Sequence, residues 1–120
     1  RSAGSAPRGI VHPLTIKHLE RHTYDTTNLT SQSWDDFEGW NPTVVITLCD
    51  QAAGETCPLY FGDSLKIHWG LPDPSKDVTN EVKNFDNIIS ILENRIVRLL
   101  NEDFENMNHS ELKLLFNTVK

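Results

Sequence analysis

The chain has 120 residues and a mass of 13.7 kDa, the usual size of one domain. Hydrophobic residues make up 38% of it, enough for a core, and no apolar run approaches the roughly 18 residues of a membrane span. The 11 basic and 17 acidic residues leave a net charge of -6, which repels phosphate backbones. The composition therefore predicts one globular domain, residues 1–120, that binds neither nucleic acid nor a membrane.

The start of the chain and the number of cysteines bear on the cellular compartment in which the protein is expected. The sequence begins at Arg1, without a charged segment followed by an apolar one, so secretion is not predicted. Cys49 and Cys57 are too few for a disulfide scaffold, which favours a reducing cytoplasm. Because the first residue is not methionine, a fragment, an internal start and a processed product are all open.

The first 40 residues predict a loop followed by two helices. Residues 1–11 are rich in small residues and glycine, which is typical of a loop. Pro13 stands at a favourable first helical position, and good helix formers continue to His22. Asp35 and two serines just before it predict a second, short helix that ends at Gly39.

Two strands are predicted in the middle of the chain. Residues 43–48 (TVVITL) are β-branched at five of six positions and apolar on both faces, which is typical of a strand buried in a parallel sheet. Cys49 follows this strand at the carboxyl end, where ligands bind in open α/β sheets. A weaker strand is predicted over residues 65–69, between Gly62 and Gly70.

Two helices are predicted in the last third. Apolar residues recur there at the helical intervals 3, 4, 3, 4 and 3, namely Val82, Phe85, Ile89, Leu92, Ile96 and Leu99. Three further apolar residues widen this stripe, so the helix is expected to contact more than one surface. Asn108, followed three residues later by Glu111, predicts a capping box at the start of a last helix that runs to Val119.

Three sets of residues are candidates for chemistry, each with an ordinary alternative. Cys49 and Cys57 are either two buried thiols or a reactive pair, since a short loop that contains glycine separates them. Asp73 stands between two prolines, where it serves either as a general acid or as an ordinary turn residue. His18 and His22 share a helix face, which would suit a metal, but no third ligand is evident nearby, and surface histidines are the favoured interpretation of the pair.

Several ordered motifs together resemble the arsenate reductases built on the low-molecular-weight protein tyrosine phosphatase fold. The similarity covers residues 1–100 approximately, and residues 101–120 form a divergent C-terminal helix. The motifs that carry it are Ser2-Ala3-Gly4-Ser5, Val11-His12-Pro13, Asp25-Thr26, Ser31-Gln32-Ser33-Trp34-Asp35, the strand and its exit at residues 44–50, Cys57-Pro58, His68-Trp69-Gly70 and Asp73-Pro74.

The resemblance implies a role for three residues of this chain. In that family a cysteine in a phosphate-binding loop attacks arsenate while an aspartate assists as acid. A second and a third cysteine then relay the disulfide to thioredoxin or to a glutathione and glutaredoxin system. The matching positions are Cys49 as the second cysteine, Cys57 as the third and Asp73 as the acid. No cofactor and no metal are implied.

No cysteine precedes Cys49, so the nucleophile and its loop are outside this sequence. The resulting expectation is a noncatalytic, self-associating protein in which Asp73 is a vestigial acid. The alternatives are the C-terminal part of a working arsenate reductase whose loop lies upstream or on another chain, and a redox-responsive module that cycles Cys49 and Cys57 between dithiol and disulfide.

The predicted fold class is α/β, a truncated phosphatase-like three-layer fold with few parallel strands per chain. In the family the first strand lies beside the strand matched by residues 43–48, so its absence would uncover one strand edge. Unpaired edges template pairing with another chain. A homodimer that completes the sheet is therefore expected, with a second copy of the chain as partner.

Overall fold

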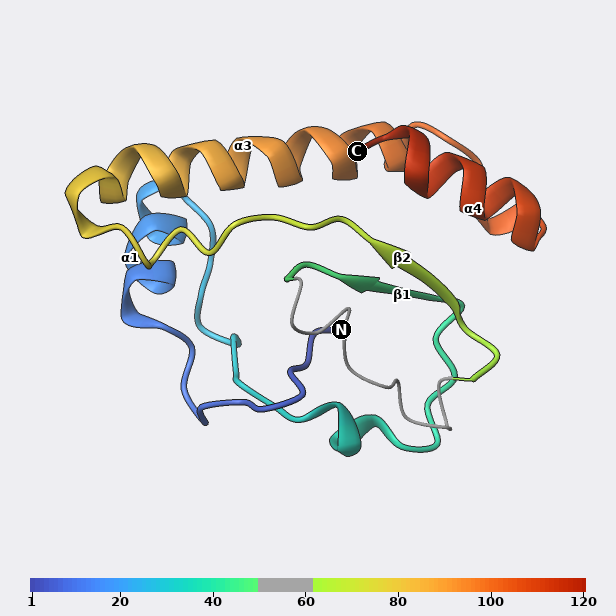
Figure 1. Cartoon of the computed structure of the whole chain (residues 1–120), viewed down its shortest axis with the longest axis horizontal. Helices are drawn as coiled ribbons and strands as arrows, with labels where there is room; N and C mark the ends of the chain where they lie inside the picture. Colours follow the sequence, from blue (N-terminus) through green and yellow to red (C-terminus); the bar gives the residue numbers. More distant parts are fainter. Residues whose placement is uncertain (50–61) are drawn as a thin grey trace. The chain divides into compact units, whose positions relative to one another are not determined.

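Residues 1–49 and 62–120 are described by a computed structural model of the chain, whose helices and strands are labelled in Figure 1. They form two compact units. The first comprises Arg1–Trp40 and Asp73–Asp86, and the second comprises Asn41–Pro72 and Asn87–Lys120. The long helix α3 (Glu81–Leu100) contributes residues to both units.

The first unit contains helix α1 (Pro13–Arg21) and the short 3-10 helix η1 (Trp34–Phe37). The His12 Nδ1 atom accepts a hydrogen bond from the Leu14 N–H at 3.1 Å and caps α1, with Pro13 in the first turn as predicted. Ser33 and Asp36 form a capping box at the start of η1. Both predicted helices of this region are confirmed.

The second unit is built on a parallel pair of strands, β1 (Val44–Thr47) and β2 (Leu65–His68). Val44 pairs with Leu65 and Thr47 with His68, so the two predicted strands and their parallel pairing are confirmed. The expectation that β1 is buried on both faces is wrong, because all four of its residues are only half-buried. In the described part of the chain β1 is hydrogen-bonded to β2 alone, so one of its edges lacks a neighbouring strand there.

Helix α3 follows the 3-10 helix η3 (Val78–Asn80), and helix α4 (His109–Thr118) follows the 3-10 helix η4 (Phe104–Asn106). The predicted capping box is confirmed: Asn108 Oδ1 accepts from the Glu111 N–H at 2.9 Å. The apolar stripe of α3 is covered only in part, since Val82 is 52% and Ile96 is 47% exposed.

The core of the second unit joins β2, the end of α3 and α4. Its buried members are Ile67, Trp69, Leu99, Leu112, Phe116 and Val119. The indole N–H of Trp69 donates to the Phe116 carbonyl oxygen at 3.1 Å, so the largest side chain of this core has no unpaired polar atom. This core holds β2 in place and thereby positions the residues that follow the two strands.

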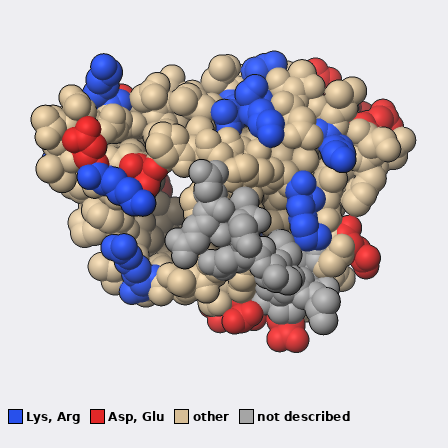
Figure 2. Space-filling view, viewed as in Figure 1, with Lys and Arg blue, Asp and Glu red and all other residues tan. Residues whose placement is uncertain are grey.

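The charged side chains are spread over the surface. On the face drawn in Figure 2, described basic and acidic residues both occur and do not merge into one continuous basic patch. Within the described residues, no helix combines the length and the apolar character that crossing a membrane requires.

Candidate functional site

The carboxyl ends of β1 and β2 lie side by side because the strands are parallel (Figure 1). Beyond the strands, the Trp69 N–H donates to the Thr47 carbonyl oxygen at 2.9 Å and the Leu71 N–H to the Leu48 carbonyl oxygen at 2.7 Å. Cys49 is the next residue after Leu48 and is exposed. A redox-capable thiol therefore stands at the edge where open parallel sheets bind ligands.

His68 reaches the same edge from β2. Its Nδ1 atom lies 2.9 Å from the Thr47 hydroxyl oxygen, as the register of the two strands requires. This pair is not evident from the sequence, because the partners are 21 residues apart and the register of the sheet is what joins them. The sequence marks His68 in one way, as part of the His68-Trp69-Gly70 motif that contributes to the family resemblance.

Asp73 forms a tight turn in the first unit. One of its carboxylate oxygens accepts from the Ser75 N–H at 2.9 Å and from the Ser75 hydroxyl at 2.6 Å. The hydroxyl bond is the main cause of a pKa below the usual aspartate value, and burial opposes it. The Ser75 N–H and the charges of Lys76 and His12 lower the pKa further. The carboxyl group is therefore ionised at neutral pH.

The three predicted site residues are distributed unevenly over the structure. Asp73 belongs to the first unit and Cys49 to the second. Cys57 lies outside the described residues. The described ranges, 1–49 and 62–120, contain no group of three side chains suited to hold a metal ion.

His18 and His22 are not a pair of surface histidines. His18 is fully buried and stacks on Phe85, with ring centroids 4.4 Å apart. Its Nε2 atom lies 2.8 Å from a Glu81 carboxylate oxygen, and His22 Nε2 lies 2.7 Å from a carboxylate oxygen of Asp86. Each histidine thus has its own carboxylate on α3, and the interpretation as surface residues is wrong for His18 because the start of α3 covers it.

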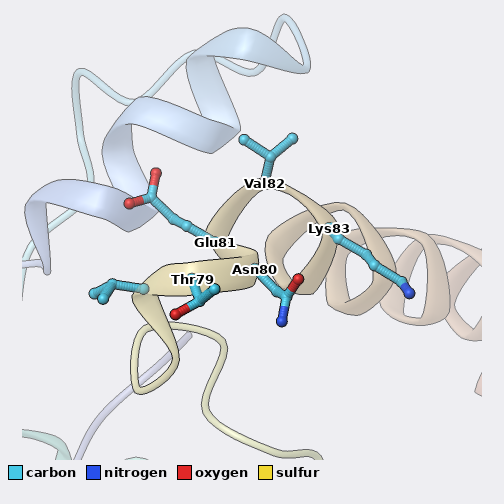
Figure 3. A pocket seen from close by; sticks show the side chains of 6 residues that line it. Thr79, Asn80, Glu81, Val82 and Lys83 are labelled. Atoms are coloured by element: carbon cyan, nitrogen blue, oxygen red, sulfur yellow. The ribbon is translucent and has the colours of Figure 1, made fainter.

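A shallow hollow of about 430 Å³ lies at the start of α3, where residues 78–83 line it (Figure 3). The Glu81 side chain extends toward α1, where it meets His18, whereas Val82 and Lys83 point elsewhere. In the second unit a hollow of about 410 Å³ lies at the amino end of β1, beside Val44 and Phe116. Thus neither hollow is lined by Cys49 or Asp73.

The fold and the motifs agree with a known family. The family model for low molecular weight phosphotyrosine protein phosphatase matches residues 1–111. The chain belongs to this family, which confirms the family named from the sequence motifs. The match extends past the expected limit near residue 100 and includes the start of α4.

Curated relatives within this family are named arsenate reductase. The protein of Halalkalibacterium halodurans is 34% identical over 83 residues, which cover 68% of this chain and 58% of that protein. The Staphylococcus xylosus protein is 35% identical over 74 residues, 62% of this chain and 55% of the relative. The Bacillus subtilis protein is 33% identical over 75 residues, which cover 62% of this chain and 52% of that protein. The chain spans about half the length of the curated relatives it matches.

Proposed function

We propose that these 120 residues supply the acid and the relay thiols of a thiol-dependent arsenate reductase and do not reduce arsenate by themselves. The observation that carries the proposal is the exposed Cys49 at the carboxyl end of β1. Within the second unit, the Leu71 N–H donates to the Leu48 carbonyl oxygen and so ties this exit to the segment that follows β2. The names of the curated relatives support the same substrate.

The relay follows from the chemistry of the thiols. A nucleophilic cysteine outside these residues forms a sulfur–arsenic(V) bond. The Cys49 thiolate then attacks that sulfur, a disulfide forms, and the electron pair of the broken sulfur–arsenic bond stays on arsenic, which leaves as arsenite. The Cys57 thiolate then attacks the Cys49 sulfur, the first cysteine leaves as a thiolate, and thioredoxin or a glutathione and glutaredoxin system reduces the resulting Cys49–Cys57 disulfide to two thiols. Such a relay requires a reducing compartment, in agreement with the predicted cytoplasmic location.

Asp73 must gain a proton before it can act as an acid. Its lowered pKa keeps it ionised in the absence of substrate. An arsenate anion nearby would raise that pKa by repulsion between like charges, and the protonated carboxyl could then donate to the leaving oxygen. Removing the hydroxyl in Ser75→Ala raises the pKa of Asp73 and should move the alkaline limb of the pH–rate profile, where the acid loses its proton, to higher pH.

The test joins the chain to the part of the Staphylococcus xylosus arsenate reductase that precedes its matched region. Arsenate reduction is followed with thioredoxin, thioredoxin reductase and NADPH. The fusion is expected to turn over, and Cys49→Ser and Cys57→Ser should each block recycling by thioredoxin. The unfused chain is the control and should show no turnover. Activity of the unfused chain, or full recycling in the Cys49→Ser fusion, would refute the proposal.

Self-association of the isolated chain is a second proposal, favoured by the edge of β1 that lacks a strand in the described residues. Backbone groups on such an edge pair readily with another strand. Two copies can pair β1 with β1 across a two-fold axis, which gives an antiparallel central pair and a sheet shared by both chains. Sedimentation velocity at micromolar concentration should then show a dimer that dissociates on dilution.

A further inference from the structure

The hollow at the amino end of β1 is lined mainly by apolar side chains. Its volume is about 410 Å³, and the whole lining belongs to the second unit. The lining residues are Thr43, Val44, Phe104, Glu105, Met107, Leu112 and Phe116. Leu112 is 5% and Phe116 is 9% exposed, so these two side chains form the floor of the hollow. The two polar members, Thr43 and Glu105, are exposed and therefore lie at its rim.

One wall of the hollow is ordered by its own hydrogen bonds. Phe104 begins η4 and follows Asp103, whose carboxylate accepts from the Asn106 side-chain amide at 2.7 Å. The Met107 N–H donates to the Phe104 carbonyl oxygen at 3.2 Å and closes the turn. Because this wall is already ordered, binding a partner there costs little conformational entropy. The Met107 side chain is flexible and polarisable, which lets it adapt to apolar groups of different shape.

The same wall carries negative charge. Residues 101–112 contain no lysine or arginine, and their four acidic residues are Glu102, Asp103, Glu105 and Glu111. Glu105 lines the hollow, and Asp103 and Glu111 each directly precede a lining residue. Lys113, exposed on α4, is the first basic residue after this stretch. Four acidic residues therefore stand against one lysine beside the hollow.

These carboxylates have no cationic partner in the part of the chain that the structure describes. Neither Glu102 nor Glu105 forms an ion pair there. Arg98 and Lys120, which belong to the same unit, bond to main-chain oxygens instead. A cation brought by a partner would thus meet carboxylates that are not already neutralised, which favours a basic partner over an acidic one.

We propose that this hollow is a docking site for a protein segment that carries a bulky apolar side chain between lysines or arginines. The apolar side chain lies on the floor formed by Leu112 and Phe116, and the cations face Glu105 and its acidic neighbours. An apolar centre with a charged rim is the usual anatomy of an anchor pocket at a protein interface. A small-molecule site instead holds polar groups that fix the orientation of the ligand, whereas the polar groups here are at the rim.

The docking site is independent of the proposed redox function. The hollow lies at the amino end of β1, whereas Cys49 follows the carboxyl end of the same strand. A segment bound in the hollow therefore leaves the thiol accessible. Alkylation of Cys49 by iodoacetamide, measured in the chain with Cys57→Ser, should proceed at the same rate with and without a docked peptide.

The experiment uses Met107, the single methionine of the sequence, as a probe inside the hollow. The full 120-residue chain is labelled at the methionine methyl carbon and titrated with a peptide of sequence KKLFKK while its methyl NMR signal is followed. The signal is expected to shift and to saturate. Peptides EELFEE and KKGGKK should bind at least about tenfold more weakly, because each lacks one of the two required features. Raising the salt concentration from about 0.02 M to about 0.3 M should weaken binding of KKLFKK.

Charge variants separate docking in the hollow from general attraction to an acidic protein. Glu105→Gln is expected to weaken KKLFKK about 2- to 5-fold, and adding Glu102→Gln should weaken it further. Glu38→Gln removes an exposed carboxylate of the first unit, is the matched control and should leave the affinity unchanged. Circular dichroism checks that the variants keep their fold.

Three results would overturn the proposal. The first is a Met107 signal that KKLFKK does not move or that EELFEE moves equally. The second is an equal loss of affinity in Glu105→Gln and Glu38→Gln. The third is a Met107 signal that changes when the chain alone is diluted, because the occupant of the hollow is then a second copy of the chain.

Discussion

The Nε2 atom of His18 lies 2.8 Å from a carboxylate oxygen of Glu81, and the histidine side chain is fully buried. On the other side of the ring, Arg21 Nε donates to Nδ1 at 3.2 Å. A guanidinium can only donate, so Nδ1 carries no proton and Nε2–H is the donor to Glu81. His18 is thus the neutral Nε2–H tautomer, bonded on both sides.

Replacing Glu81 by alanine should destabilise the first unit. The buried N–H of His18 then lacks an acceptor, which costs about 1–3 kcal/mol. Chemical denaturation measures the change, and Glu81→Gln, whose amide oxygen can still accept, should lose less. Equal losses in the two variants would contradict the assigned tautomer.

The carboxylates of α3 should make stability depend on acid pH. The hydrogen bond from His22, followed by that from Arg21, holds the pKa of Asp86 below its ordinary value. This stabilisation is therefore complete above the unfolded pKa of about 4 and is lost as the pH falls through the lower folded value. The Tm difference between the parent and Asp86→Asn should be constant above about pH 5 and shrink below about pH 4. A gap that persists at pH 2 would contradict this.

Thr23→Gly should stabilise the protein. Thr23 follows the end of α1 with a φ of 68°, a left-handed conformation that costs a β-branched residue about 1 kcal/mol and suits glycine. Thr23→Ala keeps the Cβ and is the control, with no gain expected. The free energy of unfolding in urea measures both, and a glycine variant no more stable than the alanine variant would refute the prediction.

Asn108→Ala should weaken α4 by about 1 kcal/mol, because the side chain accepts from the Glu111 N–H and caps the helix. Helix α4 supplies Leu112 and Phe116 to the core, so the loss should appear in the stability of the whole second unit. Asn108→Asp retains a cap and should stay close to the parent. Thermal unfolding followed by circular dichroism distinguishes the variants, and an alanine variant equal to the aspartate variant would exclude a capping role.

Val45→Lys should disrupt self-association. Val45 is at the centre of β1, and a lysine there opposes edge-to-edge strand pairing. The variant is expected to sediment as a monomer or to unfold, whereas Ile10→Lys, which alters an apolar residue of the first unit that is 68% exposed, should still dimerise. A parent chain that sediments as a compact monomer would rule out the dimer.

Local signals predicted most helices and strands of this chain. The Asn108 and Glu111 capping box and Pro13 at the start of α1 involve neighbours within four positions, and such contacts can be recognised in the sequence. His18 was misjudged because Glu81, its partner, is 63 residues away. The half-buried state of β1 was missed because burial depends on which elements cover the strand, and its apolar composition does not specify them.

The placement of the tryptophans gives the protein a separate optical signal for each unit. Trp69 is 6% exposed in the core of the second unit, whereas Trp34 and Trp40 belong to the first unit, and Trp40 is 37% exposed. A tryptophan shielded from water fluoresces at shorter wavelength than one in contact with it. In a Trp34→Phe, Trp40→Phe background, the emission maximum therefore follows the second unit alone, and spectra of the parent and this double variant together resolve whether the two units unfold in one step or in two.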